Sequence, residues 1–193
     1  MNWETILCLG DSITIGSRSY LGYPEYCVGI LTKKTTKNWN VINCSVAGFT
    51  VIDLARYIDQ NWSNIKGQGP LMASIMIGTN DIKSNTPLWE FEIAYSLMLL
   101  KTKLIVGSNH IVLNKIPLLQ KGVMLPYSLK MNKTIIAYNE IIEKLSQREG
   151  VILNSMPESS DIFLDGVHLN DLGSSLWGEA LSDKIMELRN GEE

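Results

Sequence analysis

The chain has few residues of the kinds that build metal sites and disulfide frameworks. It contains only two histidines, His110 and His168, and three cysteines, none of them spaced as Cys-x-x-Cys. Two histidines are too few for a multi-histidine metal centre, and three unpaired cysteines argue against a disulfide scaffold or a zinc ribbon. We therefore expect no metal and no cofactor, and buried, inert thiols at Cys8, Cys27 and Cys44.

Long apolar runs and an excess of basic charge are also missing. No stretch approaches the ~18 consecutive apolar residues of a membrane helix. The start, Asn2-Trp3-Glu4, lacks the basic residues of a signal peptide. The 17 basic and 20 acidic residues give a formal net charge of −3, which disfavours nucleic acid as a partner. These absences predict a cytoplasmic protein without membrane insertion and leave its oligomeric state open.

The rest of the composition is typical of a globular chain. Its 193 residues are about the length of one domain. Hydrophobic residues make up 45% and charged residues 19%, which is enough apolar surface for a core. Since no internal repeat or low-complexity linker interrupts the chain, we expect a single domain over residues 1–193.

Short apolar runs alternate with segments of helical periodicity. The runs are rich in Ile, Val, Leu and Met, as in strands that are buried on both faces. We predict five strands, at Thr5–Leu9, Asn40–Cys44, Ala73–Ile77, His110–Lys115 and Val151–Asn154. Strict alternation of strands and helices implies a three-layer α/β/α fold on a parallel sheet, and the flavodoxin-like strand order 2-1-3-4-5 is the natural one for five strands.

Capping residues mark where the intervening helices begin. The signals are a proline in the first turn, a Thr–Asp capping box, and Asn or Asp before an apolar stripe. They place helix starts at Pro24, at Thr50 with Asp53, at Thr86-Pro87, and at Asn170 or Asp171. At the third of these we expect Thr86 to be the cap and Pro87 the first helical residue. A further helix is marked only by its apolar residues Ile135, Tyr138, Ile142 and Leu145.

Polar residues gather in the loops that follow the strands. Ligands of open α/β sheets bind beyond the carboxyl ends of the strands, so residues in these loops meet at one edge. The loops contain Gly10-Asp11-Ser12, Ser45-Val46-Ala47-Gly48, Gly78-Thr79-Asn80-Asp81 and Asp165-Gly166-Val167-His168. A serine, a histidine with a nearby aspartate, and glycine and asparagine donors are the groups that acyl transfer requires.

The chemistry suggests a role for each of these residues. A serine hydroxyl is a poor nucleophile at neutral pH and needs a base, which makes Ser12 the candidate nucleophile and His168 its base. Asp165 lies three residues before the histidine and can fix its tautomer. We expect the oxyanion hole at the backbone N–H groups of Ser12 and Gly48 and the side-chain amide of Asn80.

Structural roles compete with several of these assignments. Ser12 taken alone also fits a helix cap. His110 begins a strand at the opposite edge of the sheet, so we expect a structural role for it. Asp161 is a second candidate for orienting the catalytic histidine. We expect Asp11 and Asp81 to brace their loops by accepting backbone N–H bonds.

The four loop blocks resemble those of the SGNH (GDSL-type) hydrolase superfamily, which is named for its Ser, Gly, Asn and His. The Gly-Asp-Ser block matches Gly10 to Ser12, the glycine block Gly48, the Gly-x-Asn-Asp block Gly78 to Asp81, and the Asp-x-x-His block Asp165 to His168. The resemblance runs from residue 5 to the last helix. It implies the flavodoxin-like fold and hydrolysis of esters or thioesters through an acyl-serine, without a metal.

Two departures from known patterns bear on this resemblance. The first block reads Gly-Asp-Ser-Ile-Thr in place of Gly-Asp-Ser-Leu, and the loop from Ile116 to Lys130 shows no family signature. The chain also has no Gly-x-Ser-x-Gly, so the nucleophile elbow of ordinary α/β-hydrolases is not the match.

The loop after the first strand indicates a substrate class. Gly-Asp-Ser-Ile-Thr followed by Gly22-Tyr23-Pro24 is similar to carbohydrate acetylesterases of the superfamily. We therefore expect a serine esterase that removes an O-acetyl group from a glycan or another small-molecule ester. Candidate substrate-binding residues are Asp11, Tyr20, Tyr23 and Tyr127. A lysophospholipase or acyl-thioesterase is the alternative enzyme, and a catalytically dead ligand-binding module is the alternative of another class.

Overall fold

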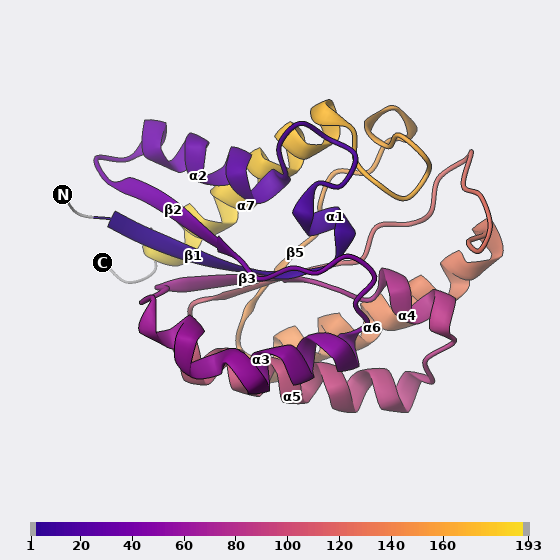
Figure 1. The fold of residues 1–193 in the computed structure, drawn as a ribbon, viewed down its shortest axis with the longest axis horizontal. Coiled ribbons are helices and arrows are strands. Elements are labelled where there is room, and N and C mark those ends of the chain that lie inside the picture. Colours follow the sequence, from indigo (N-terminus) through magenta and orange to yellow (C-terminus); the bar gives the residue numbers. More distant parts are fainter. Residues whose placement is uncertain (1–2, 191–193) are drawn as a thin grey trace.

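The computed structural model describes residues 3–190 and shows a five-stranded parallel sheet between helices (Figure 1). Neighbouring strands are hydrogen-bonded in the order β2-β1-β3-β4-β5, and every pair is parallel. The strands are β1 (Trp3–Gly10), β2 (Asn38–Asn43), β3 (Met72–Met76), β4 (Ile111–Asn114) and β5 (Ile152–Asn154). The five predicted strands and their order are confirmed, with ends that differ by at most two residues.

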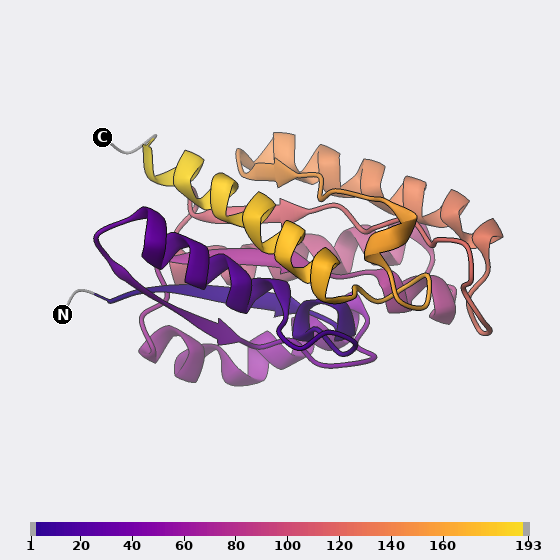
Figure 2. The same cartoon turned by 90° about the horizontal axis from the view of Figure 1, so that it is seen from above.

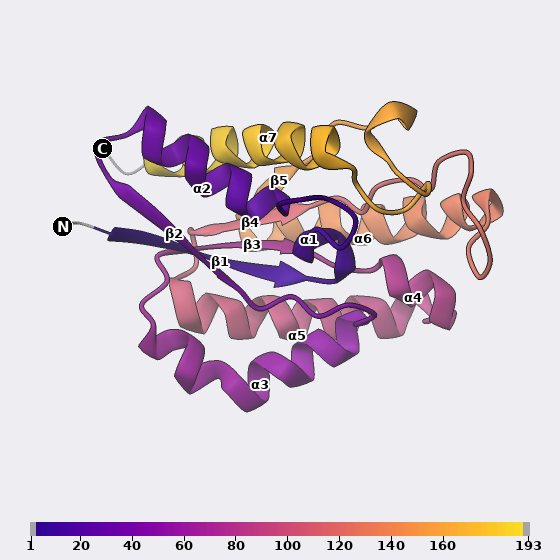
Figure 3. The ribbon, with the colours of Figure 1, turned by 45° about the horizontal axis from the view of Figure 1, so that its top comes forward.

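Helices cover both faces of the sheet (Figure 3). On one face lie α2 (Tyr23–Lys34) and α7 (Asp171–Asn190), which pack along one another (Figure 2). The other face carries α3 (Val51–Gly67), α5 (Leu88–Val106) and α6 (Asn132–Glu149). The short helices α1 (Ser12–Ile15) and α4 (Thr79–Ser84) directly follow β1 and β3, and 3-10 turns occur at Leu129–Met131 and Ser160–Ile162. Among residues 3–190, no helix combines the length and apolarity that a membrane span requires.

Burial on both faces explains the composition of the central strands. All residues of β3 and β4 are buried, because helices cover the sheet on each side.

The largest fully buried side chain is Trp177 of α7, whose indole packs edge-on against Tyr23 with ring centroids 5.7 Å apart. Tyr23 is completely buried in the first turn of α2. The expectation that Tyr23 lines a substrate pocket is therefore wrong.

Helix starts follow the signals at α2, α3 and α7 and depart from them at α5. Pro24 lies in the first turn of α2, as expected. Thr50 and Asp53 form a reciprocal capping box at α3, and the Asn170 side chain caps α7 by accepting from the backbone N–H of the third helical residue at 2.9 Å. The expected start at Thr86 is wrong, because α5 begins at Leu88 and extended Pro87 holds the cap position. The Thr86 carbonyl accepts instead from the Tyr138 hydroxyl at 2.6 Å.

The three cysteines carry free thiols. Cys8 lies in β1 and Cys27 in α2, both buried, and burial raises the pKa of each well above its ordinary value. Cys44 follows β2 and is half-buried, so the expectation of full burial holds for two of the three.

Candidate active site

The four polar loop blocks meet at the carboxyl edge of the sheet, beside α1 and α4 (Figure 1). Ser12 is the first residue of α1, directly after β1, and the Asp11 side chain caps that helix by accepting from the Ile13 N–H at 3.0 Å. Asn80 lies in the first turn of α4, directly after β3. His168 lies in the loop before α7. Parallel strands thus bring together residues that are up to 156 positions apart.

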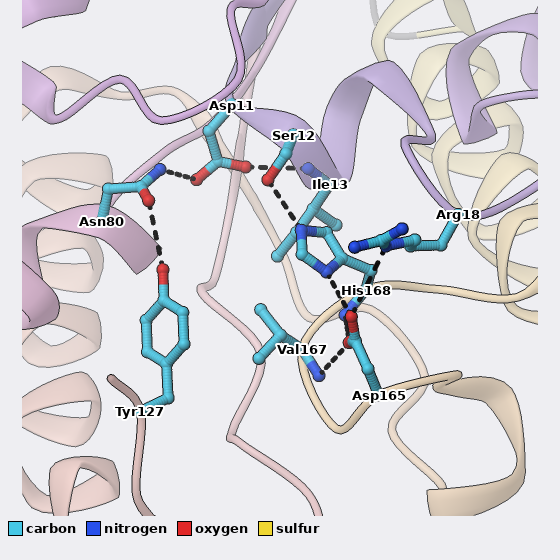
Figure 4. A network of polar contacts seen from close by, with 9 residues as sticks. All are labelled: Asp11, Ser12, Ile13, Arg18, Asn80, Tyr127, Asp165, Val167 and His168. Atoms are coloured by element: carbon cyan, nitrogen blue, oxygen red, sulfur yellow. Dashed lines mark hydrogen bonds and ion pairs between the residues drawn. The ribbon is translucent and has the colours of Figure 1, made fainter. Parts of the chain in front are cut away.

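A chain of hydrogen bonds joins a hydroxyl, an imidazole and a carboxylate (Figure 4). The Ser12 hydroxyl lies 2.9 Å from His168 Nε2, and His168 Nδ1 lies 2.8 Å from Asp165 Oδ2. With the proton on Nδ1, the imidazole donates to the carboxylate and accepts from the serine. The His168 side chain is 19% exposed and the Asp165 side chain 27%. Both groups are therefore largely but not fully shielded from solvent.

Local hydrogen bonds hold Asp165 in its ionised form. Its Oδ1 accepts from the backbone N–H groups of Val167 at 3.0 Å and His168 at 2.8 Å. Burial raises the pKa of Asp165, but these two bonds and the one from the imidazole outweigh it, so the pKa lies below its ordinary value. A carboxylate that stays ionised can stabilise a positively charged imidazole beside it.

Hydrogen bonds fasten the loops that carry Gly48 and Asn80 to the end of β1 and to each other. The loop after β2 is fastened to the end of β1 by the Val46 N–H, which donates to the Gly10 carbonyl at 3.2 Å. Gly48 has φ 85°, and a Cβ added to it would meet no atom within 4 Å, so its backbone borders open space. The Asn80 amide donates to the Phe49 carbonyl at 3.0 Å, which ties both loops together.

The unassigned loop from Ile116 to Lys130 packs against the site. The Gln120 N–H donates to the Gly166 carbonyl at 2.9 Å, and Tyr127 donates its hydroxyl proton to Asn80 Oδ1 at 3.1 Å. Burial raises the pKa of Tyr127 to about 12, so the phenol remains a donor. This bond turns the Asn80 NH₂ group away from Tyr127 and toward the serine side of the site (Figure 4).

Asp11 and Asp81 are buried carboxyl groups that brace the loops. Besides capping α1, Asp11 receives a long 3.5 Å contact from the Asn80 amide, and Asp81 accepts from the Val51 N–H at 2.9 Å. Both side chains have no exposed surface, which rules out substrate contact by Asp11, one of its expected roles. Burial raises the pKa of Asp11 to about 7 and that of Asp81 to about 6.

The raised pKa of Asp11 predicts a stability that depends on pH. The folded state holds this proton more tightly than the unfolded chain, whose aspartates have pKa values of about 3.9. The contribution of Asp11 to the free energy of unfolding therefore decreases as pH rises from about 4 to about 7. Asparagine can still accept from the Ile13 N–H, carries no charge, and loses only the long 3.5 Å contact with the Asn80 amide. Asp11→Asn should therefore stabilise the protein at pH 8 by on the order of 2–4 kcal/mol.

Urea unfolding of Asp11→Asn at pH 8 and near pH 4 measures this effect. The advantage of the variant should shrink toward zero at the lower pH. The exposed Asp183 provides the matched control, because Asp183→Asn should show no such gain. A variant less stable than the parent at pH 8, or a difference independent of pH, would contradict a buried charge at Asp11.

The remaining candidates lie apart from the hydrogen-bonded chain. Tyr20 is 86% exposed on the loop after α1. His110 precedes β4 at the opposite edge of the sheet, with Nδ1 2.9 Å from the Val106 carbonyl, as expected. Asp161 bonds to the Ser159 hydroxyl, so the contact with the imidazole is made by Asp165.

Two contacts at the site have no signal in the sequence. The Arg18 guanidinium lies 3.7 Å from Asp165 Oδ2, and its side chain remains 58% exposed. The second contact is the bond between Tyr127 and Asn80. Arg18 and Tyr127 lie on irregular loops, so neither periodicity nor strand position indicates what they touch. Within residues 3–190, no three His, Cys, Asp or Glu side chains are grouped so as to hold a metal ion.

The comparisons with known proteins agree with this geometry. Residues 8–176 match the sequence model of the GDSL-like lipase/acylhydrolase family. A comparison with curated protein sequences gives no match. Among solved structures, Axe2, an acetylxylan esterase from Geobacillus stearothermophilus, aligns with a TM-score of 0.73 and 23% identity over 94% of both chains. LAE5, an α/β-hydrolase enzyme from the metagenome of Lake Arreo, Spain, aligns with a TM-score of 0.75 and 19% identity over 96% of both chains.

The structural alignments support the fold, and the family match extends over most of the chain. That match includes Ser12, Gly48, Asn80, Asp165 and His168. The protein therefore belongs to the GDSL-like lipase/acylhydrolase family and is an ester hydrolase.

Proposed function

We propose that the protein is a serine esterase in which Ser12 attacks the carbonyl carbon of the substrate. The 2.9 Å contact between the Ser12 hydroxyl and His168 Nε2 is the observation that carries this proposal. His168 takes the serine proton as the hydroxyl attacks and gives it to the departing alkoxide, which leaves as an alcohol. A water molecule, deprotonated by the same imidazole, then attacks the acyl-serine and releases the carboxylic acid.

The known relatives support the same assignment. Catalytic mutants of Axe2 replace a serine, an aspartate and a histidine by alanine, and the last two are three positions apart, as Asp165 and His168 are here. We assign the oxyanion hole to the backbone N–H groups of Ser12 and Gly48 and to the Asn80 amide. The Asn80 NH₂ group contacts Asp11 only at the long distance of 3.5 Å, so one of its protons can donate to the oxyanion instead.

Removal of the Asn80 amide should slow the chemical step more than it weakens binding. The oxyanion exists only along the reaction path, so Asn80→Ala should lower kcat about 10²–10³-fold with little change in KM. Tyr127 orients this amide, and Tyr127→Phe should lower kcat about 2–10-fold, the effect of one hydrogen bond.

Steady-state kinetics of the two single variants and the double variant test this positioning role. If Tyr127 acts through Asn80, Tyr127→Phe should have no further effect on kcat in the Asn80→Ala background. A loss of the same size in both backgrounds would show that Tyr127 acts independently of the amide.

For the substrate we propose an O-acetyl group on a sugar or a similarly small ester. The exposed Arg18 guanidinium beside Asp165, and the exposed Tyr20 on the same loop, suit contact with a sugar ring, by hydrogen bonds and by stacking. Axe2, which has the same fold, acts on acetylated xylan. An acetyl group also needs little acyl space beyond the carbonyl carbon.

A longer acyl chain is the alternative, and one feature favours it. Met124 and Leu125 at the tip of the loop from Ile116 to Lys130 are 73% and 92% exposed. This loop contacts the site, so its apolar tip offers a surface for the chain of a lysophospholipid or an acyl thioester.

A series of p-nitrophenyl esters of increasing chain length separates the two substrates. The small-ester proposal predicts the highest kcat/KM for acetate and a fall as the chain lengthens. An optimum at about eight carbons or more would overturn it in favour of the lipid or thioester alternative. If no ester is hydrolysed at all, the catalytically dead binding module becomes the better account.

A further inference from the structure

The outer face of α5 is apolar where a surface helix is usually polar. Its inner face contributes Phe91, Tyr95 and Met98 to the core. A second row of large apolar side chains, here called the outer stripe, points away from the protein. The outer stripe consists of Trp89, Ile93, Leu97, Leu100 and Leu104, which are between 46% and 65% exposed.

The helices α3 and α5 lie side by side (Figure 3), and a groove lined by residues of both widens this apolar surface. It consists of two adjoining hollows of about 370 and 270 Å³ that share Asp59, Leu97 and Lys101. Trp62 of α3, 45% exposed, lines the second hollow. Contiguous apolar patches on monomers rarely exceed a few hundred Å², and larger ones mark interaction sites. A standard interface buries about 800 Å² on each partner, and six large side chains exposed to this degree provide area of that order.

The spacing of the outer stripe fits the same helix from a second copy. Positions 89, 93, 97, 100 and 104 recur every three or four residues, the repeat by which two helices pack along their length. If two copies of α5 lie antiparallel about a two-fold axis near Leu97, Ile93 faces Leu100 of the second copy and Trp89 faces its Leu104. Every large side chain of the stripe then meets an apolar partner.

The charges of α5 favour the antiparallel arrangement. Glu90 and Glu92 lie in its N-terminal half, and Lys101 and Lys103 in its C-terminal half. In the antiparallel register, Glu90 lies on the same flank as Lys101 of the second copy, and Glu92 on the same flank as its Lys103. Each lysine is already paired within its own chain, Lys101 with Asp59 and Lys103 with Glu149, so the glutamates would join existing ion pairs. A parallel pair would instead place like charges opposite each other.

We propose that the outer stripe and the adjoining groove form the interface of a homodimer, in which two copies of α5 pack antiparallel. An isologous interface of this kind is the commonest way in which soluble chains associate. The groove is lined by the acidic residues Asp59 and Glu90 and by the basic residues Arg56 and Lys101, so it has no net positive charge that would attract an anionic lipid surface.

Sedimentation velocity across a dilution series tests the interface. The parent protein should sediment as a dimer, and Ile93→Glu should raise the dissociation constant at least ~30-fold. Ile136 of α6, 49% exposed, gives the matched control, because Ile136→Glu should leave the dimer intact. The proposal is overturned if the parent protein is monomeric at about 100 µM, or if the two variants change the dissociation constant equally. Binding of the monomer to phosphatidylglycerol vesicles would also overturn it.

Cysteine crosslinking tests the antiparallel register. Leu97→Cys lies at the axis and should form an intermolecular disulfide with itself on oxidation. Two copies of Ile93→Cys would be offset by seven residues, about 10 Å along the helix, and should not crosslink. A mixture of Ile93→Cys with Leu100→Cys should form the intermolecular disulfide, because these two positions face each other in the antiparallel register. Crosslinking of Ile93→Cys with itself would contradict the antiparallel register, and Ile136→Cys serves as the control for random collisions.

Discussion

Ser12→Ala and His168→Ala should each remove nearly all turnover, with kcat falling about 10⁴–10⁶-fold. The two side chains act as one unit, because the 2.9 Å contact lets the imidazole take the proton as the oxygen attacks. Without the hydroxyl there is no nucleophile to activate, and without the imidazole the hydroxyl keeps its proton. The double variant should therefore be little slower than either single variant.

Two matched controls separate this loss from a general effect of substitution. Ser17 is exposed on the loop after α1, and Ser17→Ala should retain activity. His110 lies at the opposite edge of the sheet, and His110→Ala should also retain activity. If the fall in kcat of the Ser12→Ala, His168→Ala double variant equals the product of the two single falls, the residues act independently. That result would contradict the proposed mechanism.

Asp165→Asn should lower kcat about 10⁴-fold although it preserves the shape of the loop. The new carbonyl oxygen can still accept from the Val167 and His168 N–H groups. The new NH₂ group, however, faces Nδ1 and must donate to it. The imidazole proton then moves to Nε2, where it points at Ser12 and prevents His168 from accepting the serine proton.

Asp161→Asn is the control for this experiment, because Asp161 bonds to Ser159 and not to the imidazole. It should leave kcat within about twofold of the parent. Thermal unfolding of both variants should be near that of the parent, which would confine the effect of Asp165→Asn to catalysis. If Asp161→Asn were the slower enzyme, the orienting carboxylate would be misassigned.

The sheet was predictable because its strands carry a strong local signal. β3 and β4 are buried on both faces, so their residues are almost uninterruptedly apolar and stand out in the sequence. Strand ends were less certain, since they depend on where the last hydrogen bond forms. The start of α5 was misplaced because Pro87 has an extended backbone, with ψ 147°, and holds the cap position itself. The Thr86 carbonyl bonds to Tyr138, 52 residues away, a contact that no local pattern shows.

The site was predictable where its residues sit at strand ends. Ser12 and Asn80 lie in the first turns of α1 and α4, just past the ends of β1 and β3, so the topology brings them to one edge. Tyr23 was misjudged because the proline after it was used to start the helix, whereas Tyr23 itself occupies the first turn and turns inward. The contact of Tyr127 with Asn80 depends on how an irregular loop folds back over the site, which no periodicity encodes.

Reaction with a fluorophosphonate, followed by peptide mass mapping, tests the serine mechanism most directly. The reagent forms a stable bond only with an activated hydroxyl, in a geometry that mimics the tetrahedral intermediate. We expect one label per chain, on the peptide that contains Ser12, with no labelling of Ser12→Ala and strongly slowed labelling of His168→Ala. An unlabelled parent protein, or a label on another serine, would contradict the proposal that Ser12 is the nucleophile.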